Sequence, residues 1–304
     1  MNVDKLKELC DDGKFYEAQQ MFVVLFNKTF KQEKYDKCAQ ILLSGLNKMH
    51  QFKQVALLID LAKYMLSLFT KLNASTTHTF TIKEDKITAI DLIRHIVESY
   101  HQLEDITPKE DIQRMISFLD KVVTWSAEHQ VPKISDSHGE PFIHMELGKL
   151  HFKLGANEES NKNFLKSNSP DEFAEMISEW IKKGEDGEHD LFITRAVLQL
   201  LQLKKLEMAK RVFELLQQKT EKLSSTPLLH FVKFLIISIE KGNLELYHHI
   251  NQSYATELTR RDASFKDVYL DKIGSIYFGL QKSKPQNQGL GSMINSLFSS
   301  MMSK

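Results

Sequence analysis

The sequence has few cysteines and no net charge, and both shortages exclude classes of protein. Only Cys10 and Cys38 are present, which is too few for a disulfide framework. Both fall on the apolar faces of predicted helices, so we expect reduced core residues in a reducing compartment. The 40 basic and 40 acidic residues cancel. Proteins that grip nucleic acid through its phosphates usually carry a basic excess, so no nucleic acid partner is expected.

Long hydrophobic runs are also missing. The strongest one, from Phe231 to Ile239, contains Lys233 and falls far short of the roughly 20 residues of a membrane span. Six charged side chains within the first twelve residues are unlike a signal peptide. We therefore expect a cytosolic protein with no direct membrane insertion.

Proline is scarce and placed at predicted helix starts. Thr107-Pro108 and Ser169-Pro170 combine a hydroxyl N-cap with proline at the first helical position, and no proline interrupts an apolar-periodic segment. Apolar residues recur at helical spacing along most of the chain, which predicts an all-α protein of roughly fourteen helices. One stretch, 76–82, alternates like a strand. Because a lone strand has no partner, we expect an extended linker there.

A short phrase recurs at the head of several periodic segments: an aromatic residue, a small gap, then Ala or Cys. It occurs at Phe15 with Ala18, at Tyr35 with Cys38 and Ala39, and at Phe52 with Ala56. Small residues one turn from an aromatic let neighbouring helices approach closely, as in tetratricopeptide-like hairpins, although the spacing is too irregular for a strict repeat. We predict one α-solenoid over 1–280, with halves at about 1–127 and 139–280, and a flexible tail at 281–304.

Motifs for catalysis, cofactors or metals are absent from the sequence. There is no phosphate-binding glycine loop, CxxC pair, HExxH or nucleophile elbow. His144 and His151 lie two helical turns apart, about 10 Å, too far to share a zinc ion. The acidic run 184–190 lacks the ligand spacing of an EF-hand loop. We therefore predict a scaffold with no catalytic residue, no metal and no cofactor.

The tail combines apolar residues at helical spacing with serines opposite them. Three interpretations remain open: a segment that docks in a groove of this chain or a partner, an end with no role, or a membrane contact. Lys304 is the only basic residue there after Lys284, which disfavours the membrane. The apolar residues are Leu290, Met293, Ile294, Leu297, Phe298, Met301 and Met302.

Four stretches of the sequence together carry a resemblance to a known family. They are Gly13-Lys14-Phe15-Tyr16-Glu17-Ala18-Gln19-Gln20, the helix from Asp190 to Leu201, the phrase Tyr269-Leu270-Asp271-Lys272-Ile273-Gly274-Ser275-Ile276-Tyr277-Phe278-Gly279, and the Gly- and Leu-rich tail from Gly289. In this order, and over nearly the whole length, they resemble the Golgi to ER traffic protein 4 family, which acts in the guided entry of tail-anchored proteins.

This resemblance implies a non-catalytic α-solenoid that bridges two partners. The family's N-terminal helices engage the cytosolic targeting ATPase, and its C-terminal half holds a ubiquitin-like co-chaperone, in animals also a BAG-family scaffold. The chain would then pass tail-anchored clients to the ATPase for insertion at the endoplasmic reticulum. Family members carry a longer excursion before the helix at Thr226. Here only 220–225 is present, so we expect the groove helices to bear more of the ubiquitin-like interface.

The resemblance also suggests the binding residues. Positions off the apolar faces of the first hairpins are the candidates for the ATPase: Lys5, Glu8, Lys14, Tyr16 and Gln20. The helix from Thr226 is apolar nearly all round and must be covered. We expect an apolar groove between it and the helix near Tyr269 for the ubiquitin-like partner, unless these residues pack within the chain. The residues concerned are Leu228, Phe231, Leu235, Tyr269, Leu270, Ile273 and Tyr277.

Two other classes of function fit the same composition. One is an unrelated helical-repeat scaffold subunit of a coat-like or lid-like complex. The other is an enzyme on an all-α scaffold, for which the sequence offers no converging titratable groups.

Overall fold

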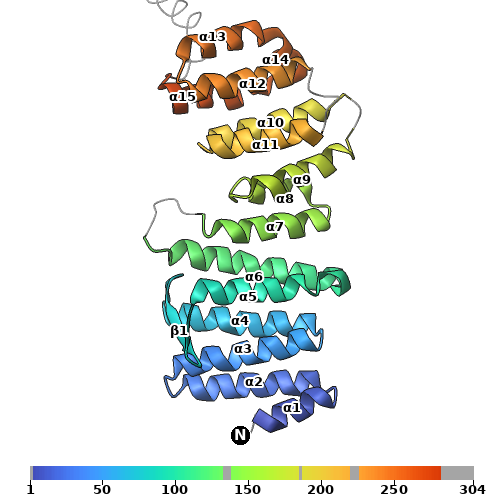
Figure 1. Cartoon of the computed structure of the whole chain (residues 1–304), viewed down its shortest axis with the longest axis vertical. Coiled ribbons are helices and arrows are strands. Elements are labelled where there is room, and N and C mark those ends of the chain that lie inside the picture. Colours follow the sequence, from blue (N-terminus) through green and yellow to red (C-terminus); the bar gives the residue numbers. More distant parts are fainter. Residues whose placement is uncertain (1–2, 133–137, 185–186, 220–225, 282–304) are drawn as a thin grey trace, which may run out of the picture. The chain divides into compact units, whose positions relative to one another are not determined.

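The computed structural model describes residues 3–132, 138–184, 187–219 and 226–281, which fall into two compact units, Met1–Ser169 and Pro170–Lys304. Within each unit, successive helices form antiparallel hairpins that stack on one another (Figure 1). The described residues form fifteen α-helices and one two-stranded sheet. The predicted all-α solenoid class is confirmed. The tail from 282 lies outside the described residues.

The first unit carries eight α-helices, a β-hairpin and a 3₁₀ turn. Their bounds are α1 Val3–Asp11, α2 Phe15–Phe30, α3 Tyr35–Gln51, α4 Val55–Lys71, β1 Thr79–Ile82, β2 Asp85–Thr88, α5 Ala89–His101, η1 Glu104–Ile106, α6 Lys109–Glu128, α7 Pro141–Lys153 and α8 Asn157–Phe164.

The described residues of the second unit form seven α-helices and one π-helical segment. Their bounds are α9 Pro170–Ile181, α10 His189–Gln202, α11 Leu206–Lys219, α12 Pro227–Glu240, α13 Leu244–Ser253, α14 Ala255–Arg261, η3 Phe265–Leu270 and α15 Asp271–Phe278.

The recurring sequence phrase marks one repeated turn between helices. At each turn a residue takes a left-handed backbone conformation, and the next residue's N–H bonds the carbonyl five residues earlier, at 2.8–3.4 Å. This is the Schellman arrangement, which satisfies the last carbonyls of a helix and lets a new helix start almost at once. The left-handed residues are Gly13, Glu33, Lys53, Gly155, Lys204 and Gly242 between helices, and Asn73 between α4 and β1.

The small residues of the phrase lie where two helices pack. Ala18, Cys38 and Ala39 are almost fully buried. Cys10 and Cys38 are both buried and free, as expected for reduced core residues. Burial raises the pKa of the Cys38 thiol to about 11, so it stays protonated at neutral pH.

The expectation of a linker at 76–82 was wrong. Thr79–Ile82 pairs antiparallel with Asp85–Thr88, with Phe80 opposite Ile87, around a turn in which Lys83 has φ 60°. The sequence pattern does not predict the partner strand, because Asp-Lys-Ile-Thr has no clear apolar alternation. Phe80 is fully buried and stacks on Phe69 of α4 with ring centroids 5.5 Å apart, and Phe69 in turn contacts Trp125 at 5.2 Å. The helices therefore supply the packing that a lone hairpin lacks.

One predicted cap was also wrong. α6 begins at Lys109 with Pro108 as its N-cap residue, and Thr107 lies outside the helix. The Thr107 hydroxyl instead donates to the Leu103 carbonyl at 2.7 Å and closes the preceding 3₁₀ turn. By contrast, Thr226 caps α12, accepting from the Leu229 N–H at 3.4 Å.

Candidate partner-binding surfaces

The first candidate surface lies on α1 and α2. Glu8, Lys14, Tyr16 and Gln20 are exposed, and the Tyr16 ring is 66% accessible. Lys5 lies in α1, but its side chain is outside the described part of the structure. Lys14 forms an exposed ion pair with Asp12 at 3.3 Å, which contributes little to stability. Four of the five positions predicted for the ATPase thus face solvent.

The exposed stripe of α2 extends beyond the residues that were predicted from the sequence. Ala18, Phe22 and Phe26 fill the core side, so the residues between them at four-residue spacing emerge opposite. Beyond Gln20 the stripe continues through Val24, which is 54% accessible, to Lys28. A shallow hollow of about 460 Å³ follows there, lined by Val24, Asn27, Lys28, Lys31 and Gln32. The four-residue spacing that begins at Tyr16 in the sequence predicts these residues as well.

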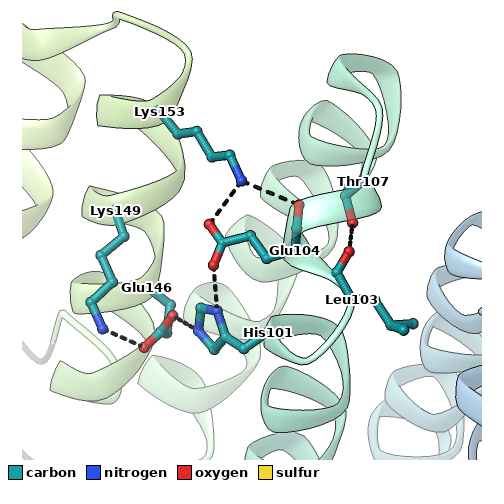
Figure 2. A network of polar contacts seen from close by, with 7 residues as sticks. All are labelled: His101, Leu103, Glu104, Thr107, Glu146, Lys149 and Lys153. Atoms are coloured by element: carbon teal, nitrogen blue, oxygen red, sulfur yellow. Dashed lines mark hydrogen bonds and ion pairs between the residues drawn. The ribbon is translucent and has the colours of Figure 1, made fainter.

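A polar network joins α5, η1 and α7 within the first unit (Figure 2). His101 stands between two carboxylates: its Nε2 bonds Oε2 of Glu146, and its Nδ1 lies 3.3 Å from Oε2 of Glu104. Lys153 reaches the other Glu104 oxygen at 3.1 Å, and Lys149 lies 3.4 Å from the other Glu146 oxygen. The buried Glu146 carboxylate is therefore paired on both oxygens.

These contacts favour the charged form of His101. The hydrogen bond to Glu146 raises the pKa of His101 above its usual value, more than burial lowers it, and Glu104 adds to the rise. Burial acts to raise the pKa of Glu104, but the hydrogen bonds from Lys153 and His101 outweigh it and leave the pKa of Glu104 lowered. The network holds α7 to the end of α5 electrostatically.

The second candidate surface was predicted on α12 and α15, and the structure corrects its geometry. Five of the seven predicted residues are buried within the second unit: Leu228, Phe231, Leu235, Leu270 and Ile273. The Phe231 ring packs against Tyr254 at 5.7 Å, at the junction of α13 and α14. The α12 side of the expected groove is thus filled from within the chain. The exposed residues of α12 are its two ends, Pro227 and Glu240, and a central stripe of His230, Lys233 and Phe234, with Phe234 42% accessible.

The two remaining predicted residues lie at the surface. Tyr269 and Tyr277 are half-buried, and the Tyr269 ring makes an edge contact with Phe265 at 6.1 Å. The Tyr277 hydroxyl is buried with no hydrogen-bond partner among the described residues. Burial also raises the pKa of Tyr277. Each ring therefore keeps part of its surface available to a partner.

An open cavity lies on another side of the second unit. It has a volume of about 430 Å³ and is walled by α13, α14, η3, α15 and the two residues after Gly279; we call it the α13–α15 cavity. Of the seven predicted residues only Leu270 lines it. Tyr247 also lines the cavity. Its hydroxyl donates to the Leu270 carbonyl at 2.7 Å, and its ring packs on the Phe278 ring at 4.7 Å.

Two arginine–aspartate pairs fix the α14 wall of this cavity to α10. Arg195 donates to Asp262 at 2.9 Å, and Arg261 bonds both Asp190 and the Gly187 carbonyl. Ser264 hydrogen-bonds Asp262 as well and, together with Arg195, lowers the pKa of that carboxyl. The acidic run 184–190 thus contributes Asp190 to a structural ion pair.

Of the two histidines considered as ligands, His144 has structural partners. His144 is buried, with Nδ1 2.9 Å from Asn163 Oδ1 and Nε2 2.6 Å from the His138 carbonyl. Burial lowers the pKa of His144, against the opposing hydrogen bonds to Asn163 and the His138 carbonyl. Among the described residues no group of three or more His, Cys, Asp or Glu side chains is arranged to hold a metal ion. In the same residues, no helix combines the length and hydrophobicity of a membrane span.

Comparison with known proteins agrees with this architecture. The chain is 29% identical over 288 residues to the Golgi to ER traffic protein 4 homolog of Dictyostelium discoideum, covering 95% of this chain and 85% of that protein. It is 27% identical to the Homo sapiens homolog over 304 residues, covering 97% and 86%. The crystal structure of C. therm. Get4 has the same fold, with a TM-score of 0.75 at 22% identity, covering 97% of this chain and 94% of that one. The family model described as Golgi to ER traffic protein 4 matches residues 32–298, and this chain belongs to that family.

Proposed function

We propose that the chain is a non-catalytic adaptor in the targeting of tail-anchored membrane proteins to the endoplasmic reticulum, working in the cytosol. Its membership of the Golgi to ER traffic protein 4 family carries this proposal. The stacked hairpins support it, because a solenoid displays long surfaces for other proteins. In this proposal it bridges a cytosolic targeting ATPase and a ubiquitin-like co-chaperone, with a BAG-family scaffold as a further partner.

The ATPase contact is proposed on the α1–α2 stripe. Tyr16 supplies an exposed aromatic anchor, and Lys14, Lys28 and Glu8 supply charge around it. Aromatic side chains dominate the energy of many interfaces, while charges at the rim act mainly on association rate and its salt dependence. Lys5 and Gln20 complete the proposed contact.

The ubiquitin-like contact is proposed at Tyr269 and Tyr277, with the buried Leu270 as support next to Tyr269 in the chain. Leu228, Phe231, Leu235 and Ile273 lie behind them as buried support rather than as contacting groups. Truncating one of these four would therefore weaken the unit itself, whereas truncating Tyr269 or Tyr277 tests the contact.

Binding of the purified chain to the targeting ATPase, measured at low and at moderate salt, tests the bridge. Lys5→Glu with Lys14→Glu should slow association several-fold at low salt, with a smaller effect at higher salt. A matched control, Lys86→Glu with Lys121→Glu, makes the same charge change at two exposed sites of the first unit outside the stripe. Equal binding by the stripe variant, the control and the unaltered chain would remove the contact from α1–α2.

A further inference from the structure

We propose that the C-terminal segment 290–302 docks in the α13–α15 cavity of its own chain. Such docking would be a property of the isolated chain and does not depend on the adaptor function.

The cavity is suited to apolar side chains and offers one unsatisfied polar atom. Its walls include Tyr247, Leu258, Leu270 and Leu280. Asn251 also lines it, and its side-chain Oδ1 is buried without a hydrogen-bond partner among the described residues. A buried acceptor left unpaired destabilises the folded chain. A donor on the occupant would remove that penalty.

The residues that follow α15 turn back toward this cavity. Gly279 has φ 68°, and the following Leu280 N–H bonds the Gly274 carbonyl at 3.2 Å, five residues before Gly279. This C-cap folds Leu280 onto α15: a Cβ at Gly274 would meet Leu280 Cδ1 and the Tyr247 hydroxyl at 3.0 Å each. Leu280 and Gln281 both line the cavity. The described chain thus ends inside the wall of the cavity.

The tail has enough length to reach the cavity. Leu290 follows Gln281 by nine residues, and a flexible chain of that length spans roughly 15–18 Å on average. A short tether of this kind corresponds to an effective concentration in the millimolar range. Even weak contacts would therefore keep a matching segment in place.

The chemistry of the segment matches the cavity. No charged residue occurs from Pro285 to Ser303, so the segment itself brings no charge to the cavity, whose own lining includes Asp262, Lys266 and Asp271. Leu297, Phe298 and Met301 share one face at helical spacing, and methionine adapts to irregular apolar space. Asn295 and Ser300, at the edges of that face, supply donors for Asn251. A helix laid in an apolar groove by such a face is a common mode of recognition.

Amide hydrogen exchange on the isolated full-length chain tests the docking. We expect Leu297→Asp with Phe298→Asp to speed exchange in α13, α14 and α15 about tenfold or more, because the docked tail would add at least about 1.4 kcal/mol locally. The control, Ser296→Asp with Ser299→Asp, introduces the same charge on the polar face and should leave exchange near that of the unaltered chain. Identical exchange in all three proteins would overturn the proposal.

A cysteine pair then identifies the occupant. Gln252 is exposed at the cavity, so Gln252→Cys with Ser296→Cys should form a disulfide within one chain on mild oxidation, at a rate independent of protein concentration. The native Cys10 and Cys38 are buried and remain as they are. A disulfide found only between two chains would show that a second copy fills the cavity, and no disulfide would show that the tail does not reach it. Either result refutes self-docking and leaves the adaptor function untouched.

Discussion

His101 of α5 and Glu146 of α7 share a hydrogen bond between the imidazole Nε2 and a buried carboxylate oxygen, although 45 residues separate them in sequence. The bond joins two elements with the whole of α6 between them along the chain. Because Glu104 holds the other ring nitrogen, the network favours imidazolium in the folded state and makes part of the stability of the first unit depend on pH.

The directions of the two pKa shifts determine the pH range in which the network stabilises the first unit. The pKa of His101 is raised in the folded chain above its ordinary value of 6.5, so its stabilising contribution is complete below pH 6.5. It is lost as the pH rises through the folded-state pKa. The pKa of Glu104 is lowered from 4.5, so its contribution is complete above pH 4.5 and is lost as the pH falls. The network therefore stabilises most between about pH 4.5 and 6.5.

We expect His101→Gln to flatten this dependence. Between pH 6 and pH 8 the unaltered chain should lose more thermal stability than the variant, because only the unaltered chain releases a proton there from residue 101. Thermal unfolding of both proteins across this range measures the difference. His95→Gln, on the same helix but bonded to Asn47, is the control and should keep the pH profile of the unaltered chain. Parallel profiles for all three would mean that His101 carries no linked proton.

The repeated turns predict a stabilising substitution. Lys204 is exposed and sits at φ 60° between α10 and α11, a conformation that L-residues adopt at a cost of roughly 1–2 kcal/mol. Lys204→Gly should stabilise the second unit, by about 0.5–1 kcal/mol after the extra chain entropy of glycine is subtracted. Urea unfolding measures it. Lys34→Gly, at φ −92°, gains nothing from glycine and should destabilise instead; stabilisation by both substitutions would contradict the backbone argument.

Gly148 of α7 is expected to tolerate no side chain. A Cβ there would lie 2.8 Å from two ring carbons of Phe164, and Ser160 donates to its carbonyl at 2.8 Å. Gly148→Ala should therefore destabilise the first unit by about 1–3 kcal/mol through overpacking of α7 on α8. Adding Phe164→Leu should recover part of the loss in urea unfolding, because the two changes share one contact. If the effects of the two substitutions on the free energy of unfolding simply add, the strain does not lie in the contact between residues 148 and 164.

The proposed ubiquitin-like contact predicts a loss of affinity without a loss of fold. Tyr269→Ala should weaken binding of the ubiquitin-like partner by about 2 kcal/mol, roughly 30-fold. Calorimetric titration measures the affinity, and circular dichroism checks the fold. Phe234→Ala removes an exposed aromatic from α12 as the control and should leave binding unchanged. The reverse result, with Phe234 dominant, would move the contact to the α12 stripe.

Sequence periodicity alone determined the helices, because a residue every three or four positions must be apolar to cover a neighbouring helix. The recurring aromatic and small residues indicated the hairpin turns. A helix end and the small residue that follows it, such as Ala18, lie within a few residues of each other in sequence. The exposure of Tyr16 and Gln20 also followed from the register of α2.

Tertiary structure alone decided what covers each apolar face. The helix from Pro227 was recognisably apolar all round, but whether Phe231 met a partner or Tyr254 depended on where α13 and α14 return. The strand Asp85–Thr88 forms because α4 and α6 supply aromatic packing for its partner strand, which no local pattern records. Likewise His101 and Glu146 meet only because α5 and α7 are packed together, and long-range contacts of this kind are set by the stacking of whole helices.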